Sequence, residues 1–152
     1  MEVKDFSVAR DAIKKSSESS SVYIGSDSIR FKKDGEWYAR YSTVVILHMD
    51  SNKGGKVYYH TKTMRDYGNI RNRLMTEVNE AVEAAQAIID VIGDRRLEIH
   101  LDLNADPKHK SNVAVKEALG WVQGVTGLKA KIKPEAFAAT HAADHVVRFK
   151  NL

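Results

Sequence analysis

The sequence contains no cysteine, only two prolines and nine glycines, and no long apolar run. Without cysteine there can be no disulfide bond, thiolate zinc site or cysteine nucleophile, and the chain suits a reducing compartment, so we expect a cytoplasmic protein. The scarcity of proline and glycine argues against long disordered segments. The longest apolar stretch, around residues 44–47, is far too short to span a bilayer. The first residues also lack the apolar core of a signal peptide, so we expect no membrane association.

Several sequence motifs of catalysis are missing as well. The chain has no Gly-x-Gly-x-x-Gly fingerprint and no Gly-x-x-x-x-Gly-Lys phosphate loop, so folds that bind nucleotide cofactors gain no support. None of its many serines lies in a nucleophile elbow. Nucleophilic acyl transfer and nucleotide-cofactor chemistry are therefore poor hypotheses.

The length and composition indicate one ordinary globular domain. The 152 residues are enough to bury a hydrophobic core, and 43% of them are apolar and 29% charged. We expect a single domain over residues 1–152, in which residues 1–21 form an N-terminal helix and a serine-rich linker. The formal net charge of +4 weakly favours a polyanionic partner such as nucleic acid, although a modest positive charge serves solubility equally well.

Hydrophobic periodicity predicts an α/β fold. The pattern predicts a leading helix over residues 3–15, strands over 22–27, 37–48 and 56–63, a helix over 70–92, a strand over 97–104, a helix over 112–123 with Ser111 as its N-cap, a strand over 128–133 and a helix over 136–148. Asp34-Gly35 is a strong hairpin signal between the first two strands. Three antiparallel strands followed by alternating helix and strand predict a mixed five-stranded sheet flanked by helices.

Four acidic residues stand at the edges of four different predicted elements. Asp27 ends the first strand, Glu77 lies early in the long helix, Asp102 lies near the end of the fourth strand, and Asp144 falls in the last helix. Carboxylates in apolar settings are costly unless they are paired, hydrogen-bonded or bound to metal. If the fold brings these four together, they form a site for two hard divalent cations and so for phosphoryl transfer.

Each of these acids also has a simpler explanation. Asp27 could cap the turn after its strand, and the face of the strand that carries Asp102 could be solvated. A polar helix face would explain Asp144 equally well. Glu77 flanks the apolar stripe of its helix instead of lying opposite it, which favours an inward-facing role.

The order of elements resembles that of the ribonuclease H superfamily over residues 22–148. The segments 24–28 (Ile-Gly-Ser-Asp-Ser), 100–104 (His-Leu-Asp-Leu-Asn) and 110–112 (Lys-Ser-Asn) resemble in particular its YkuK-type branch. The resemblance implies a ribonuclease H-like fold and a metal-dependent nuclease that hydrolyses phosphodiester bonds in RNA or DNA.

The resemblance also implies roles for individual residues. Asp27 would bridge two Mg²⁺ or Mn²⁺ ions, Glu77 and Asp102 would hold one of them, and Asp144 the other. His141 would be an alternative fourth ligand or a proton shuttle.

Two further functions remain open. The His-x-x-Asp spacing of His141 and Asp144 is similar to that of RuvC-type Holliday junction resolvases, which implies a two-fold homodimer. Alternatively, the chain is a non-catalytic module that binds nucleic acid or protein and has kept the fold.

The segment 53–73 is the most basic part of the chain. It holds six basic residues against one acidic residue, with tyrosines interleaved, a pattern that suits single-stranded nucleic acid. The alternative is that the tyrosines pack and the arginines are solvated. The candidate contacts to nucleic acid in this segment and in the loop after Asp102 are Lys62, Arg65, Arg71, Arg73, Lys108 and Lys110.

Overall fold

The computed structural model describes residues 1–51 and 53–136, which form one five-stranded sheet and three α-helices. The elements follow in the order α1 (Ser7–Lys15), β1 (Ser21–Lys33), β2 (Glu36–His48), β3 (Gly55–Arg65), α2 (Ile70–Ile88), β4 (Arg96–Asn104), α3 (Val115–Thr126) and β5 (Lys131–Lys133), with 3₁₀ turns η1 (Met49–Ser51), η2 (Ile89–Val91) and η3 (Lys110–Ala114). None of the described helices is long and apolar enough to cross a membrane.

The sheet is mixed, with strand order β3-β2-β1-β4-β5. β1 pairs antiparallel with β2, and β2 with β3, whereas β4 runs parallel to both β1 and β5. The predicted architecture of three antiparallel strands followed by alternating helix and strand is confirmed.

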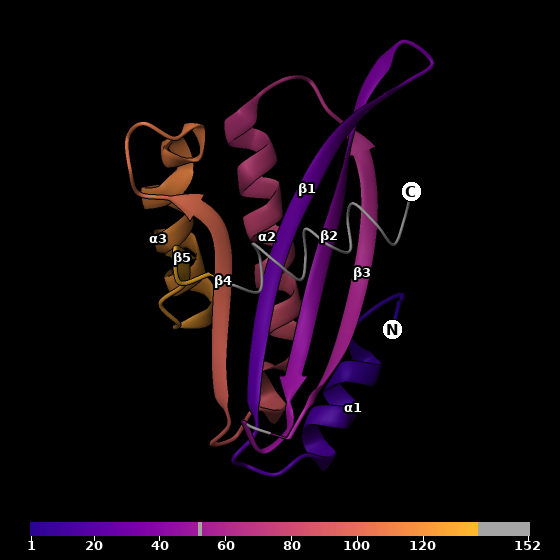
Figure 1. The fold of residues 1–152 in the computed structure, drawn as a ribbon, viewed down its shortest axis with the longest axis vertical. Coiled ribbons are helices and arrows are strands. Elements are labelled where there is room, and N and C mark those ends of the chain that lie inside the picture. Colours follow the sequence, from indigo (N-terminus) through magenta and orange to yellow (C-terminus); the bar gives the residue numbers. More distant parts are fainter. Residues whose placement is uncertain (52, 137–152) are drawn as a thin grey trace.

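The three helices lie together on one face of the sheet (Figure 1). Alternate residues of β1 and β4 enter the core beneath them, among them Val22, Ile24, Ile99 and Leu101, all at most 2% exposed. Because side chains alternate along a strand, the residues between them point to the opposite face. Tyr23, Asp27, His100 and Asp102 therefore belong to the face without described helices.

The long helix α2 covers the middle of the sheet. The Asn69 side chain caps its start by accepting a hydrogen bond from the Asn72 N–H at 3.0 Å. The buried residues Val78, Ala81 and Ala85 recur at spacings of three and four, so one stripe of the helix faces the strands. The burial of this stripe fixes the rotation of α2, and so the direction of Glu77.

The β1–β2 hairpin is longer than the sequence pattern predicts. β1 does not end at Asp27 but continues to Lys33, and its outer part projects beyond α2 (Figure 1). Asp34 and Gly35 form the tight turn with φ values of 52° and 80°. Both positive values suit the primed turns that match the twist of antiparallel strands. Asp27 consequently pairs with Ser42 inside the sheet and does not cap a turn.

Other boundaries also differ from the prediction. α1 begins at Ser7 and not at residue 3, because the Val3 N–H donates to the Tyr59 carbonyl at 2.8 Å. The expected N-cap Ser111 is wrong, because the 3₁₀ turn η3 precedes α3 and Ala114 is the cap residue. The predicted helix over residues 136–148 lies, apart from its first residue, outside the described residues.

Candidate functional site

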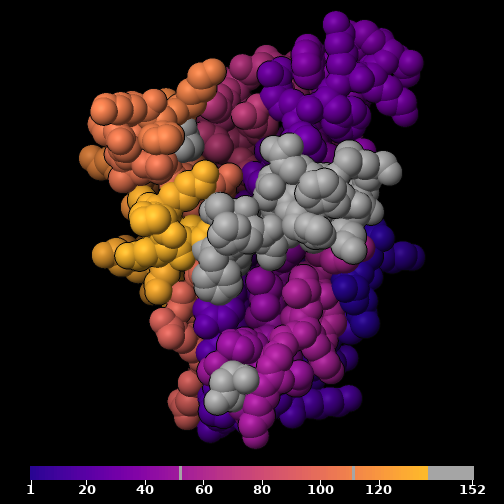
Figure 2. Space-filling view, viewed as in Figure 1, coloured from indigo at the N-terminus to yellow at the C-terminus, as the bar shows by residue number. Residues whose placement is uncertain are grey.

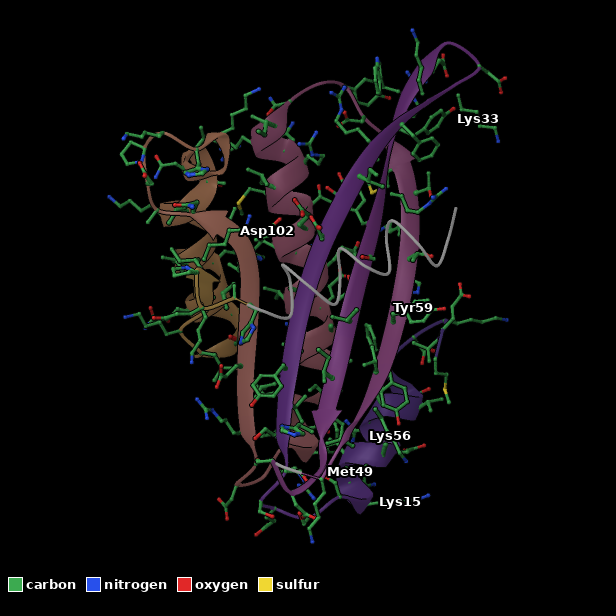
Figure 3. All side chains as sticks on the ribbon, viewed as in Figure 1. Lys15, Lys33, Met49, Lys56, Tyr59 and Asp102 are labelled. Carbon is green, nitrogen blue, oxygen red and sulfur yellow. The ribbon has the colours of Figure 1, made fainter. Side chains whose placement is uncertain are left out.

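The candidate site lies where β1 and β4 stop pairing. Their parallel register runs from Ser21↔Arg96 to Ser26↔Leu101. Asp27 and Asp102 are the next residue of each strand. Figure 3 shows Asp102 near the end of β4, beside β1 and α2. The carboxylates of Asp27 and Asp102 thus lie side by side on adjacent parallel strands, directly after the last paired residues.

Glu77 joins this pair from α2. Because β1 and β4 no longer pair at this level, a side chain from the helix-covered face can meet Asp27 between them. Asp27 and Glu77 are only 8% and 7% exposed, and their carboxyl groups share a hydrogen bond. Asp27 Oδ1 also accepts the Ser28 N–H at 2.8 Å, which orients its carboxyl group. The prediction that Glu77 faces inward is confirmed by its burial.

The pKa of Glu77 lies well above its usual range. Burial is the largest cause, because it removes water from the charged form, and the negative charges of Asp27 and Asp102 add to it. The positive charge of Arg73 opposes the shift but does not cancel it. Glu77 is therefore protonated more readily than an exposed glutamate.

A small cavity of about 10 Å³ lies beside these groups. It is lined by Ser26, Leu74, Glu77, Val78, Leu101, Asp102 and Leu103. This is close to the smallest volume that holds one water molecule or a small ion. The carboxylates of Glu77 and Asp102 and the polar residue Ser26 give such a cavity its polar partners.

A basic residue that the sequence pattern did not predict, Lys133, lies next to Asp102. Lys133 Nζ lies 2.7 Å from Asp102 Oδ1 and forms an ion pair with it. β5 brings it there, because Asn104 on β4 pairs with Lys133 on β5. The contact could have been predicted from the sequence only by noting that the last predicted strand carries a lysine and pairs with the strand that carries Asp102.

A buried histidine lies two residues before Asp102 on the same face of β4. His100 is completely buried, and its Nε2 lies 3.0 Å from Glu98 Oε1. Lys131 Nζ also lies 3.0 Å from that oxygen. Burial lowers the pKa of His100, although the Glu98 carboxylate opposes this. The alternative that this face of β4 is solvated does not hold at His100.

The predicted nucleic-acid contacts are distributed over several places. Lys62 Nζ lies 3.3 Å from Glu80 Oε1, and Arg65 Nη1 lies 2.7 Å from Glu36 Oε2. Arg71 forms an ion pair with Glu117 on α3. Arg73 lies close enough to influence Glu77, and Lys108 and Lys110 are exposed in the loop after β4. Three of the six charges are thus already matched by acids of the fold.

The predicted fourth ligand cannot be placed, because Asp144 and His141 lie outside the described residues. Within residues 1–51 and 53–136, no group of three or more His, Asp or Glu side chains is arranged as a ready metal-binding cluster. The chemistry of the donor set nonetheless fits hard cations: Asp27, Glu77 and Asp102 offer only oxygen ligands, and burial together with their mutual repulsion raises the pKa of Glu77.

The mixed sheet with strand order β3-β2-β1-β4-β5, with acidic residues on β1, α2 and β4, defines a ribonuclease H-like fold. The family model described as Ribonuclease H-like matches residues 6–148. The chain belongs to this ribonuclease H-like family, in its YkuK-type branch. No curated protein and no solved structure matches the chain.

Proposed function

We propose that this protein is a metal-dependent nuclease that hydrolyses phosphodiester bonds in RNA or DNA. One observation carries the proposal: Asp27, Glu77 and Asp102 come from three different elements and lie close enough that the charges of both aspartates add to the effect of burial in raising the pKa of Glu77. Membership of the ribonuclease H-like family supports it, since these three residues stand where the resemblance implies the family's acidic ligands.

The three carboxylates would hold two Mg²⁺ or Mn²⁺ ions. When bound, such ions supply a nucleophilic water and neutralise charge on the phosphate and the leaving oxygen. Asp27, Glu77 and Asp102 would be ligands of these ions, and Asp144 or His141 would supply the fourth ligand. Glu77 must release its proton to serve as a ligand, so cation binding and deprotonation of Glu77 are coupled.

Lys133 would balance the charge of the site. Its ammonium group neutralises Asp102 and is itself a cation next to the proposed ligands. When Asp102 binds a divalent ion, Lys133 would contact a phosphate oxygen of the substrate instead. The same lysine would thus balance charge both before and after the substrate binds.

A cleavage assay tests the proposal. Purified protein would be incubated with Mn²⁺, Mg²⁺ or chelator and with single-stranded RNA, single-stranded DNA, RNA–DNA hybrid and a four-way DNA junction. We expect cleavage of at least one substrate with metal and none with chelator. Asp27→Asn and Asp102→Asn should abolish it, since each removes a ligand charge while keeping the shape of the side chain.

Asp94→Asn is the matched control, because Asp94 is an exposed aspartate in the loop before β4. It should cut like the parent protein. If the parent protein cuts none of the four substrates with either metal, the nuclease proposal is wrong.

The ion pair of Lys133 with Asp102 favours a second candidate, a non-catalytic binding module. In that protein the lysine permanently replaces the divalent ion as the partner of Asp102. Calorimetric titration with Mn²⁺ separates the two functions: a nuclease binds Mn²⁺ and loses it in Asp27→Asn, whereas a binding module takes up no Mn²⁺ and binds nucleic acid equally well with Asn at position 27.

A further inference from the structure

The outer part of the β1–β2 hairpin carries alternating aromatic and arginine side chains. The rings of Phe31 and Tyr38 stack with centroids 5.7 Å apart and an angle of 20°. The Arg40 guanidinium lies 5.0 Å from the Phe31 ring, and that of Arg65 lies 5.5 Å from the Tyr38 ring. Arg65 is also 5.3 Å from the ring of Tyr67, which is 83% exposed. We call this group the hairpin platform; it consists of Phe31, Tyr38, Arg40, Arg65 and Tyr67.

The strand residues of the platform lie on the same face of the sheet as Asp27. Phe31 follows Asp27 by four residues on β1, so the two side chains point the same way. Phe31 pairs with Tyr38, and Tyr38 pairs with Arg65. Residues paired across antiparallel strands share a face, so the platform continues across β2 to β3. At about 3.3 Å per residue, Phe31 lies roughly 13 Å along the strand from Asp27.

Part of the positive charge at and beside the platform has no acidic partner, although Arg65 itself is paired with Glu36. Among the described residues, Lys33 and Arg40 form no ion pair, whereas Lys62 and Arg71 are each paired with a glutamate. Lys33 lies at the outer end of the hairpin (Figure 3). The strands of the hairpin and their turn, residues 28–41, hold four basic residues and two acidic ones. This excess favours a polyanion.

The surface shape also suits a ligand. A hollow of about 390 Å³ is lined by Phe31, Lys33, Asp34, Tyr38, Arg40 and Thr63. Figure 2 shows the hairpin projecting at the top right of the molecule. Planar groups beside unmatched cations offer stacking surfaces for bases and contacts for phosphates. A base pair inside a duplex would hide the faces of its bases, so the stacking surface favours unpaired bases.

We propose that the hairpin platform binds single-stranded nucleic acid and holds it so that the strand runs toward Asp27. Phe31, Tyr38 and the guanidinium planes would stack on bases, and Arg40 and Lys33 would contact phosphates. The inference rests on the proposed function only for the chemical class of ligand, because binding at the platform does not require the carboxylates to be active.

Binding is measured with Asp27→Asn protein in chelator, so that no cleavage interferes. Fluorescence anisotropy would follow a labelled single-stranded oligonucleotide, as RNA and as DNA, and a duplex of the same sequence. We expect the single strand to bind more tightly than the duplex. Tyr38→Ala should weaken binding of the single strand about 5- to 150-fold, the range found when stacking on one base is lost.

Two matched variants show whether the effect is specific. Tyr38→Phe keeps the ring and should bind like the parent protein, which also controls for folding of the hairpin. Trp121→Ala removes a 47% exposed aromatic from α3, outside the platform, and should leave binding unchanged. If Trp121→Ala weakens binding as much as Tyr38→Ala, the platform is not the binding surface.

The charge is tested separately. Arg40→Gln should weaken binding and reduce the slope of log Kd against log salt concentration by about 0.7, the value for one phosphate contact to a single strand. Lys14→Gln, an exposed lysine on α1, should change neither. An unchanged salt slope in Arg40→Gln overturns the proposed phosphate contact.

The outcomes distinguish this inference from the proposed function. If the wild-type protein cuts nucleic acid and Tyr38→Ala and Arg40→Gln bind and cut equally well, the platform proposal fails and the nuclease proposal stands. If the hairpin variants lose binding but wild-type protein with Mn²⁺ cuts nothing, the platform stands and the nuclease proposal fails. Tighter binding of the duplex, or no binding of a single strand, overturns the platform proposal.

Discussion

The carboxyl groups of Asp27 and Glu77 share a hydrogen bond where both side chains are less than a tenth exposed. Two carboxylates cannot form this bond unless one of them carries a proton. Burial and the negative charge of Asp27 raise the pKa of Glu77, which favours a proton on this carboxyl group. The charge of the pair therefore depends on pH and on any cation that replaces the proton.

Replacing Glu77 with glutamine should change how stability depends on pH. The pKa of Glu77 is raised in the folded protein, so the folded state binds more protons than the unfolded state above about pH 4.5. This contribution to stability is complete below that pH and is lost as pH rises through the folded pKa. The loss amounts to about 1.4 kcal/mol for every pH unit by which the folded pKa exceeds the unfolded one. Urea unfolding in chelator should show a smaller loss of stability with rising pH in Glu77→Gln than in the wild-type protein.

The matched control is Glu83→Gln, since Glu83 is an exposed glutamate on the same helix. Its stability should vary with pH as that of the wild-type protein does. Parallel pH curves for wild type and Glu77→Gln would contradict a raised pKa at Glu77.

Mn²⁺ or Mg²⁺ should stabilise the protein against heat. A cation that binds the folded state alone raises the free energy of unfolding by about 2.7 kcal/mol at a concentration one hundred times its Kd. A thermal melt with Mn²⁺ and with chelator should show this increase in Tm for wild type and for Asp94→Asn. Asp27→Asn should show none, and an equal increase in that variant would place the metal elsewhere.

Replacing Lys133 with methionine should separate charge balance from structure. Both partners of its ion pair with Asp102 are partly exposed, so loss of the pair should cost only about 0.2–1 kcal/mol in chelator. Removing the positive charge should tighten Mn²⁺ binding measured by calorimetry. Lys129→Met, an exposed neighbour, should change neither quantity. Weaker Mn²⁺ binding in Lys133→Met would contradict competition between lysine and metal.

His100 should give the opposite pH dependence to Glu77. Its pKa is lowered by burial, so below about pH 6.5 the unfolded state binds more protons than the folded state. The stability that neutral His100 contributes is present above this pH and is lost as pH falls. His100→Gln should flatten the acid side of the stability curve in urea unfolding, whereas His109→Gln, in an exposed loop, should leave it unchanged. An unaltered acid limb in His100→Gln would refute the lowered pKa.

Periodicity predicted the core of the site because each acid is placed by a different local pattern. Strand alternation places Asp102 opposite Leu101 and Leu103, and helix phase places Glu77 beside the buried stripe. The end of β1 was not predictable in the same way. Residues 28–32 alternate between polar and apolar side chains, but none of them is buried, and the charges of Arg30, Lys32 and Lys33 before Asp34-Gly35 are equally typical of a loop.

Contacts between elements could not be read from the sequence. The pattern predicted a strand over residues 128–133, but Lys133 meets Asp102 only through the register of this strand against β4, which the pattern does not give. The acid partners of Lys62 and Arg71 lie on α2 and α3, so their charges looked available to a ligand when each segment was considered alone. The expected cap Ser111 failed because a 3₁₀ turn precedes α3.

β1 carries both Asp27 and Phe31, so this strand sets a constant distance between the candidate site and the hairpin platform. The spacing of the two side chains is set by backbone geometry and by pairing with β2 on one side. A slip by one residue against β2 would turn every side chain of β1 to the other face, so the pairing keeps both side chains on their common face. A strand of nucleic acid anchored at Phe31 would thus be cut at one constant distance from the anchored base, whatever its sequence.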